Sequence, residues 1–152
     1  MYVIPAGDKA ELVAAYMTEK TGAEFQPGMF QALAILSDTD DFVGGVIISN
    51  FRTTDCEISC AAETPAAWRP SVMCGVFTYV FLQLGCVRCT SITTKQNKKA
   101  RQFLLDLGFQ LEGNIRLGYD GTKDALIYGL LASECRWIKA GDQNLDGQEV
   151  VT

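Results

Sequence analysis

The sequence predicts an α/β domain with one mixed, mostly antiparallel sheet of six or seven strands and three to four flanking helices. Short runs rich in β-branched and aromatic residues recur between clusters of turn residues, a pattern typical of strands. Three longer segments repeat their apolar residues at helical spacing. The length of 152 residues suits a single domain that buries its own core.

The first part of the chain predicts a strand, a helix and then three consecutive strands. A short strand at residues 2–6 precedes an amphipathic helix, for which Asp8 offers an N-cap and Thr21-Gly22 a C-terminal stop. The connectors that follow are short enough for hairpins, so we expect three antiparallel neighbours. These strand-like runs occupy residues 30–36, 42–51 and 56–63.

The second part predicts two further helices and three strands. The first helix spans residues 68–84, with Pro70 in its first turn and Gly85 after its end. The second spans residues 97–107 and is closed by Gly108. The strands are expected at residues 86–93, 109–117 and 125–131. Residues 141–152 are polar and acidic without a period, so we expect one domain over residues 1–140 and a flexible tail.

Charge and hydropathy exclude several classes of protein. The net charge of −5 repels nucleic acid and favours cationic partners. No apolar run approaches the length of a membrane span, and the N-terminus lacks the basic-then-apolar order of a signal peptide. We therefore expect a cytoplasmic protein that binds neither membrane nor nucleic acid.

The chain has six cysteines and no histidine. Catalysis by Ser-His or Cys-His pairs and mixed Cys/His zinc sites are excluded because they need an imidazole. Cys86 and Cys89 form a CxxC pair, the one candidate for a redox or metal site. On a strand at residues 86–93 they would face opposite sides of the sheet, which argues against a shared ligand. We expect reduced, structural cysteines and no metal.

Several segments in the second part resemble the GNAT acyltransferase superfamily. Residues 97–109 (NKKARQFLLDLGF) resemble its N-x-x-A helix, which ends in Gly-Phe, and residues 111–116 (LEGNIR) resemble a run common in its protein N-terminal (ribosomal-protein alanine) acetyltransferase branch. Residues 79–88 and 124–130 are also similar to that branch. The whole pattern, with Glu134-Cys135-Arg136-Trp137, resembles small GNAT proteins of phages and prophages.

The resemblance implies a GNAT fold and a cleft that binds acetyl-CoA. The pantetheine arm would bind the backbone of the strand at residues 56–63, and the pyrophosphate would lie on amides at the start of the next helix. In this chain the loop at residues 64–69 has no glycine, and Pro65 and Pro70 each remove a donor. The implied cofactor contacts are Ser59, Cys60, Ala61, Ala62, Ala67, Trp68, Arg69, Ser71, Asn97, Ala100, Arg101 and Phe103. For Asn97 a helix N-cap, and for Arg69 and Arg101 a solvated surface position, are the structural alternatives.

Acyl transfer to an amine needs a base for the ammonium proton and an acid for the leaving thiolate. Glu63 is the first candidate base and Glu57 the second, because residues six apart share one face of a regular strand. The family tyrosine aligns with Leu104, and the serine of the N-terminal acetyltransferase branch aligns with Ala100. Tyr79, Tyr119 or Tyr128 would have to protonate the thiolate, unless water does so.

Two functional hypotheses follow. The first is an N-acetyltransferase that moves an acetyl group from acetyl-CoA to a primary amine by direct attack in a ternary complex. Its acceptor would be a protein N-terminus, a lysine or a small amine. The second is a catalytically degenerate GNAT domain that serves as a binding or structural module, because the loop lacks glycine and the two hydroxyl groups are missing. A homodimer is compatible with both.

Overall fold

The computed structural model describes residues 1–138, in which seven strands form one sheet of order β1-β2-β3-β4-β5-β7-β6. Every neighbouring pair is antiparallel except β4 and β5, which are parallel. The predicted element order and the mixed, mostly antiparallel sheet are therefore confirmed. The strands are β1 (Tyr2–Pro5), β2 (Phe30–Leu36), β3 (Phe42–Ser49), β4 (Asp55–Ala62), β5 (Arg88–Thr94), β6 (Gln110–Ile115) and β7 (Ala125–Leu131).

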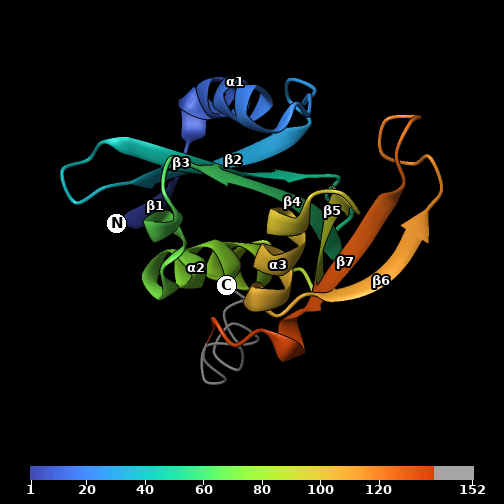
Figure 1. Cartoon of the computed structure of the whole chain (residues 1–152). Helices are drawn as coiled ribbons and strands as arrows, with labels where there is room; N and C mark the ends of the chain where they lie inside the picture. The colour runs from blue at the N-terminus through green and yellow to red at the C-terminus, as the bar shows by residue number, and fades with distance from the viewer. Residues whose placement is uncertain (139–152) are drawn as a thin grey trace.

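Helices lie on both faces of this sheet. Helix α1 packs on one face, and α2 and α3 lie on the opposite side (Figure 1). The α-helices are α1 (Ala10–Thr21), α2 (Pro70–Phe77) and α3 (Lys98–Leu107). Shorter helical turns are η1 (Gly7–Lys9), η2 (Pro65–Trp68), η3 (Thr78–Gln83) and η4 (Ala132–Glu134).

The sheet separates two apolar clusters. The smaller cluster joins Val13, Ala14 and Met17 of α1 to side chains of β2 and β3. The larger cluster lies under α2 and α3 and includes the side chains of Cys56 and Ile58 of β4. Ala61 of β4 packs against the smaller cluster, so alternate residues of β4 contribute to opposite faces of the sheet.

Most helix ends follow the predicted signals. Gly22 ends α1 with φ of 78°, and Gly108 ends α3 with φ of 106°, a conformation that glycine adopts without strain. The Asn97 side chain caps α3 by accepting a hydrogen bond of 3.1 Å from the Ala100 N–H. The expected Asp8 cap is wrong, because Asp8 lies within η1 and the residue before α1 is Lys9.

The long helix expected at residues 68–84 is divided into three parts. Pro70 disfavours helical backbone in the residue before it, and Arg69 is extended with ψ of 160°, which separates η2 from α2. The third part, η3, is a π-helix in which Val80 and Phe81 are buried.

Two further findings concern the ends and the surface of the fold. The predicted tail at residues 141–152 lies outside the described residues. Within residues 1–138 no helix is long and apolar enough to span a membrane.

Substitution of Gly44 in β3 tests how closely β3 must approach β4. A Cβ atom at this position would lie 2.7 Å from the Ala61 carbonyl oxygen and 2.8 Å from the Ala62 Cβ atom. We expect Gly44→Ala to lower the free energy of unfolding by about 1–3 kcal/mol, because backbone atoms cannot move aside as a flexible side chain does. Urea denaturation followed by circular dichroism measures the change.

Gly113→Ala in β6 is the matched control, since a Cβ atom there meets nothing within 4 Å. Equal stability of the Gly44→Ala and Gly113→Ala variants would show that close contact between β3 and β4 is not required.

Candidate functional site

The parallel pair of strands β4 and β5 separates early. Only three residue pairs align along it, Asp55 with Arg88, Cys56 with Cys89 and Glu57 with Thr90. Beyond them β4 continues to Ala62 and β5 to Thr94, and the two strands diverge (Figure 1). We call the opening between residues 58–62 and 91–94 the fork.

Backbone groups of β4 face this fork. On its other edge β4 remains paired with β3, and the Glu63 N–H continues that ladder with a bond of 2.9 Å to the Val43 carbonyl. Because the direction of the backbone groups alternates along a strand, the N–H and C=O groups of Cys60 and Ala62 point toward β5. Within residues 1–138 the β5 ladder supplies no partner for them.

The base of the fork is closed by a side chain. The Ser91 hydroxyl donates a hydrogen bond of 3.2 Å to the Ile58 carbonyl oxygen. Beyond this bond, an extended molecule that carries amide groups is able to pair with β4 as an added strand would. Of the four predicted β4 contacts, Cys60 and Ala62 direct backbone groups into the fork, whereas Ser59 and Ala61 direct theirs to β3.

The start of α2 follows β4 and offers hydrogen-bond donors. The Arg69 carbonyl accepts bonds of 3.0 Å from both Val72 and Met73. The N–H groups of Arg69 and Ser71 have no acceptor within residues 1–138. Free N–H groups and the helix dipole favour an anion at this position. The Arg69 Nε atom donates 3.0 Å to the Ala66 carbonyl, and the residue is exposed.

Two aromatic rings connect η2 to α3. The centroids of Trp68 and Phe103 are 5.2 Å apart, and both side chains are half-buried against the larger core. Ala67 is buried beneath them and Ala100 is half-buried on α3. The predicted residues of η2 and α3 are thus brought together across the space that separates the two helices.

Arg101 is held by its own chain. Its Nε atom donates 3.3 Å to the Tyr128 hydroxyl, and Nη1 donates 3.1 Å to the Lys95 carbonyl. Tyr128 is only 1% exposed and lies on β7 opposite Ser91, the residue at the base of the fork. Leu104, at the position of the family tyrosine, is buried.

The two candidate carboxylates differ in their partners. Glu63 accepts a hydrogen bond of 2.7 Å from Tyr16 and forms an ion pair of 2.9 Å with Lys20, both on α1. Hydrogen bonds from Lys20 and Tyr16 lower the pKa of Glu63. Glu57 instead accepts a bond of 2.9 Å from the neutral amide of Asn50. Glu57 also stands at the last paired position before the fork.

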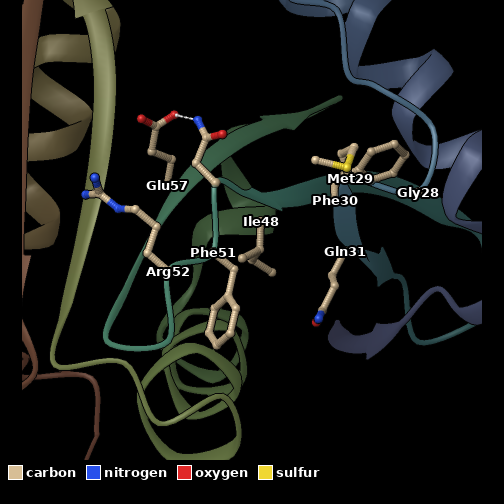
Figure 2. Close-up of a pocket in the computed structure, with 9 residues that line it drawn as sticks. Gly28, Met29, Phe30, Gln31, Ile48, Phe51, Arg52 and Glu57 are labelled. Carbon is tan, nitrogen blue, oxygen red and sulfur yellow. Dashed lines mark hydrogen bonds between the residues drawn. The ribbon is translucent and has the colours of Figure 1, made fainter.

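A pocket of about 590 Å³ adjoins Glu57, where β2 begins, β3 ends and β4 begins (Figure 2). We call it the Glu57 pocket. Tyr79 donates a hydrogen bond to Gln31, one of the lining residues, and burial raises the pKa of Tyr79. Sequence reasoning placed most of this lining on three expected strands and missed the pocket, although the apolar Met29 and Phe51 beside turns were a usable signal. The lining comprises Gly28, Met29, Phe30, Gln31, Ile48, Asn50, Phe51, Arg52 and Glu57.

The cysteines are free thiols, and three of them lie together. The expectation that Cys86 and Cys89 face opposite sides of the sheet is wrong: β5 begins only at Arg88, and both pack with Cys56 in the larger core. Burial raises the pKa of the Cys60 and Cys86 thiols to about 12. Within residues 1–138 no group of three His, Cys, Asp or Glu side chains is placed to hold a metal ion.

Comparison with solved structures identifies the fold. A variant of spermidine N-acetyltransferase SpeG from Vibrio cholerae matches 88% of this chain and 96% of its own, with a TM-score of 0.71 and 11% identity. A GNAT-family acetyltransferase from Bacillus anthracis matches over 68% of this chain and 67% of its own, with a TM-score of 0.59 and 15% identity. A probable acetyltransferase matches over 69% and 62%, with a TM-score of 0.55 and 24% identity.

By sequence, no protein-family model and no curated protein matches the chain. The structural matches show that the chain has the GNAT fold.

The paired state of Glu63 predicts a pH-dependent stability. A lowered pKa in the folded chain stabilises it above the unfolded pKa of about 4.3, and this contribution is lost as pH falls through the folded pKa. We expect Glu63→Gln to lower Tm at pH 7, and the difference from the unsubstituted protein to shrink between pH 7 and pH 3. Thermal unfolding at both pH values measures it.

Glu24→Gln is the control, because Glu24 has no hydrogen bond or ion pair within the part of the chain that the structure describes. A Tm difference for Glu63→Gln that persists unchanged at pH 3 would contradict the assigned pairing.

Proposed function

We propose that this protein is an N-acetyltransferase that transfers the acetyl group of acetyl-CoA directly to a primary amine within a ternary complex. One observation carries the proposal: Glu57 stands at the base of the fork and also lines the adjoining pocket. A carboxylate is thus shared by a channel suited to an acyl donor and a pocket suited to an acceptor. The GNAT fold and the acetyltransferase names of its structural neighbours support the same reaction.

The fork suits acetyl-CoA, the acyl donor. Acetyl-CoA has a pantetheine arm with two amide groups, for which Cys60 and Ala62 supply backbone donors and acceptors. Its pyrophosphate is an anion, for which the N–H groups of Arg69 and Ser71 and the Arg69 guanidinium are the available donors. The arm would supply an activated thioester next to Glu57.

The remaining residues that were predicted to contact acetyl-CoA shape its binding site in this proposal and do not hydrogen-bond to it. Asn97 and Arg101 shape the start of α3 through their own hydrogen bonds. Ala67 and Ala100 leave space because their side chains are small. Trp68 and Phe103 form an aromatic wall between η2 and α3.

We assign the base role to Glu57 in preference to Glu63. A base must receive the proton that the ammonium group of the acceptor gives up, and Glu63 is already engaged by Lys20 and Tyr16. The neutral amine nitrogen then forms a bond to the acetyl carbon and gives up its second proton, and the carbon–sulfur bond breaks with its electron pair on sulfur. Coenzyme A leaves as a thiolate that takes up one proton, and the other proton passes from Glu57 to solvent.

Tyr128 is our candidate for the proton donor to this thiolate. Its hydroxyl oxygen accepts from Arg101, and its own proton has no acceptor within residues 1–138. Its strand position opposite Ser91 places it beside the fork. Tyr79 in turn positions Gln31 at the Glu57 pocket.

We propose a cytoplasmic enzyme that is related to small phage-encoded GNAT proteins and to the N-terminal acetyltransferase branch, because the segments 97–109 and 111–116 resemble both. Homodimer formation and a single domain over residues 1–140 are part of the same proposal.

Substitution of the two carboxylates separates their roles. We expect Glu57→Gln to lower kcat by about 100- to 10,000-fold, the usual contribution of general-base catalysis, and to leave the Kd of acetyl-CoA unchanged. Glu63→Gln, the matched substitution on the same strand face, should retain most of kcat. Release of free thiol from acetyl-CoA in the presence of an acceptor amine measures kcat for both variants. A larger loss from Glu63→Gln would return the base role to Glu63.

Arg69 tests the donor end of the site. We expect Arg69→Ala to weaken acetyl-CoA binding by about 1.5–3 kcal/mol, the value of a hydrogen bond to a charged group. The chain has two tryptophans, so in a Trp137→Phe background the fluorescence of Trp68 reports binding next to Arg69. Arg116→Ala, at an exposed arginine beyond β6, is the control.

Absence of acetyl-CoA binding would favour the binding-module alternative. A ligand at 100 times its Kd adds about 2.7 kcal/mol of stability, so an unchanged Tm at millimolar acetyl-CoA, with unchanged Trp68 fluorescence, would contradict the enzyme assignment.

A further inference from the structure

We propose that the acceptor is a primary amine with a single positive charge on an apolar body, and that polyamines are poor substrates. This inference rests on the proposed acetyl transfer and goes beyond it by naming the substrate class. It is carried by the charges and the apolar side chains of the Glu57 pocket. Figure 2 shows that Glu57 lies on one side of the pocket and that Met29 and Phe30 lie across from it.

The Glu57 pocket holds one carboxylate. Glu57 is the only acidic residue of its lining, and its hydrogen-bond partner is the uncharged Asn50. One ammonium group therefore finds one counter-charge. A polyamine brings further ammonium groups, which are costly to bring against apolar surface without carboxylate partners.

Three other carboxylates on or beside β4 and β6 are already paired with cations of the chain. Arg52 also lines the pocket, and it binds Asp55 through Nε at 3.1 Å and through Nη2. Glu63 is paired with Lys20, and Glu112 of β6 is paired with Arg88 at 2.8 Å. A second ammonium group of an extended acceptor would thus have to displace a cation that the protein itself provides.

Apolar side chains provide the rest of the lining. Met29 is 71% exposed and Phe51 is 47% exposed, and both line the pocket together with Phe30 and Ile48. Burial of such surface against an apolar substituent is favourable in proportion to the area removed from water. The flexible side chain of methionine adapts to bodies of different shape.

Two side-chain amides complete the Glu57 pocket. Asn50 donates through Nδ2 to Glu57, and Gln31 accepts the Tyr79 hydroxyl through Oε1. Their second polar atoms, Oδ1 and Nε2, have no partner within residues 1–138. They supply one acceptor and one donor, so a polar group near the amine is tolerated. The same chemistry is found in an arylalkylamine and in a peptide N-terminus with a large apolar first residue.

A comparison of acceptors tests the inference. With the full chain and acetyl-CoA, thiol release is measured for phenethylamine, for a tripeptide amide beginning with Phe, and for spermidine. We expect kcat/KM for one of the first two to exceed that for spermidine at least tenfold, and their order identifies the source of the amine. A value for spermidine equal to or above both would overturn the inference.

A binding measurement keeps the test independent of turnover. If none of the amines is acetylated, the proposed function fails, and the substrate class is then tested by saturation-transfer NMR with phenethylamine and spermidine. We expect a phenethylamine signal that Glu57→Gln and Phe51→Ser each reduce strongly. Tighter binding of spermidine than of phenethylamine would overturn the inference in this arm also.

Two substitutions probe the apolar lining. Phe51→Ser should lower kcat/KM for phenethylamine about tenfold and leave that for spermidine nearly unchanged. Met29→Glu adds a second carboxylate and should raise kcat/KM for spermidine several-fold. Leu12→Ser on α1, at a leucine that is 68% exposed outside the pocket, is the control and should alter neither. Equal effects of Phe51→Ser on both amines would contradict the role of the apolar lining.

Discussion

The site depends on the early separation of β4 from its parallel neighbour β5. Three aligned pairs hold the strands together, and then β4 stays with β3 instead. Gly44 makes this choice possible, because without a side chain β3 comes close to the backbone of Ala61 and Ala62. The second half of β4 is thereby fixed on one edge and left with free backbone groups on the other.

The charges around the fork give Glu57 a special position. Asp55, Glu63 and Glu112 each have an arginine or lysine partner. Such partners favour the ionised carboxylate and weaken it as a base, as the lowered pKa of Glu63 shows. Glu57 is hydrogen-bonded to the neutral amide of Asn50, and the nearby Arg52 forms its ion pair with Asp55 instead. A group that must accept a proton and attract a cation benefits from this arrangement.

Much of the fold could be predicted from the sequence, because its signals are local. The runs at residues 30–36 and 125–131 match β2 and β7 residue for residue, and Asn97 and Gly108 bound α3 as expected. The failures have local causes as well. Pro70 divides the helix expected at residues 68–84, and β5 starts later than its apolar run, which misplaced Cys86.

The candidate site could be predicted only in part. Both carboxylates were found by strand spacing, but their order as bases depends on Lys20 and Tyr16, which lie more than forty residues before Glu63 in the chain. No pattern in the sequence shows that these side chains meet. The Glu57 pocket was missed for the same reason, since segments around Gly28 and Phe51 come together only through the pairing of β2 with β3.

The start of α2 is the proposed phosphate site, and it differs from a glycine-rich loop. Pro65 and Pro70 carry no N–H group, so the loop has fewer donors than a glycine-rich loop. The extended backbone at Arg69 compensates in part. Its carbonyl accepts hydrogen bonds from the N–H groups of Val72 and Met73, and the N–H groups of Arg69 and Ser71 have no acceptor within the described chain. In the proposed complex with acetyl-CoA there are fewer amides at the pyrophosphate, so more of the binding energy comes from the fork and from the Arg69 side chain. In this proposal the affinity for acetyl-CoA depends on the same strand separation that places Glu57 beside the acceptor.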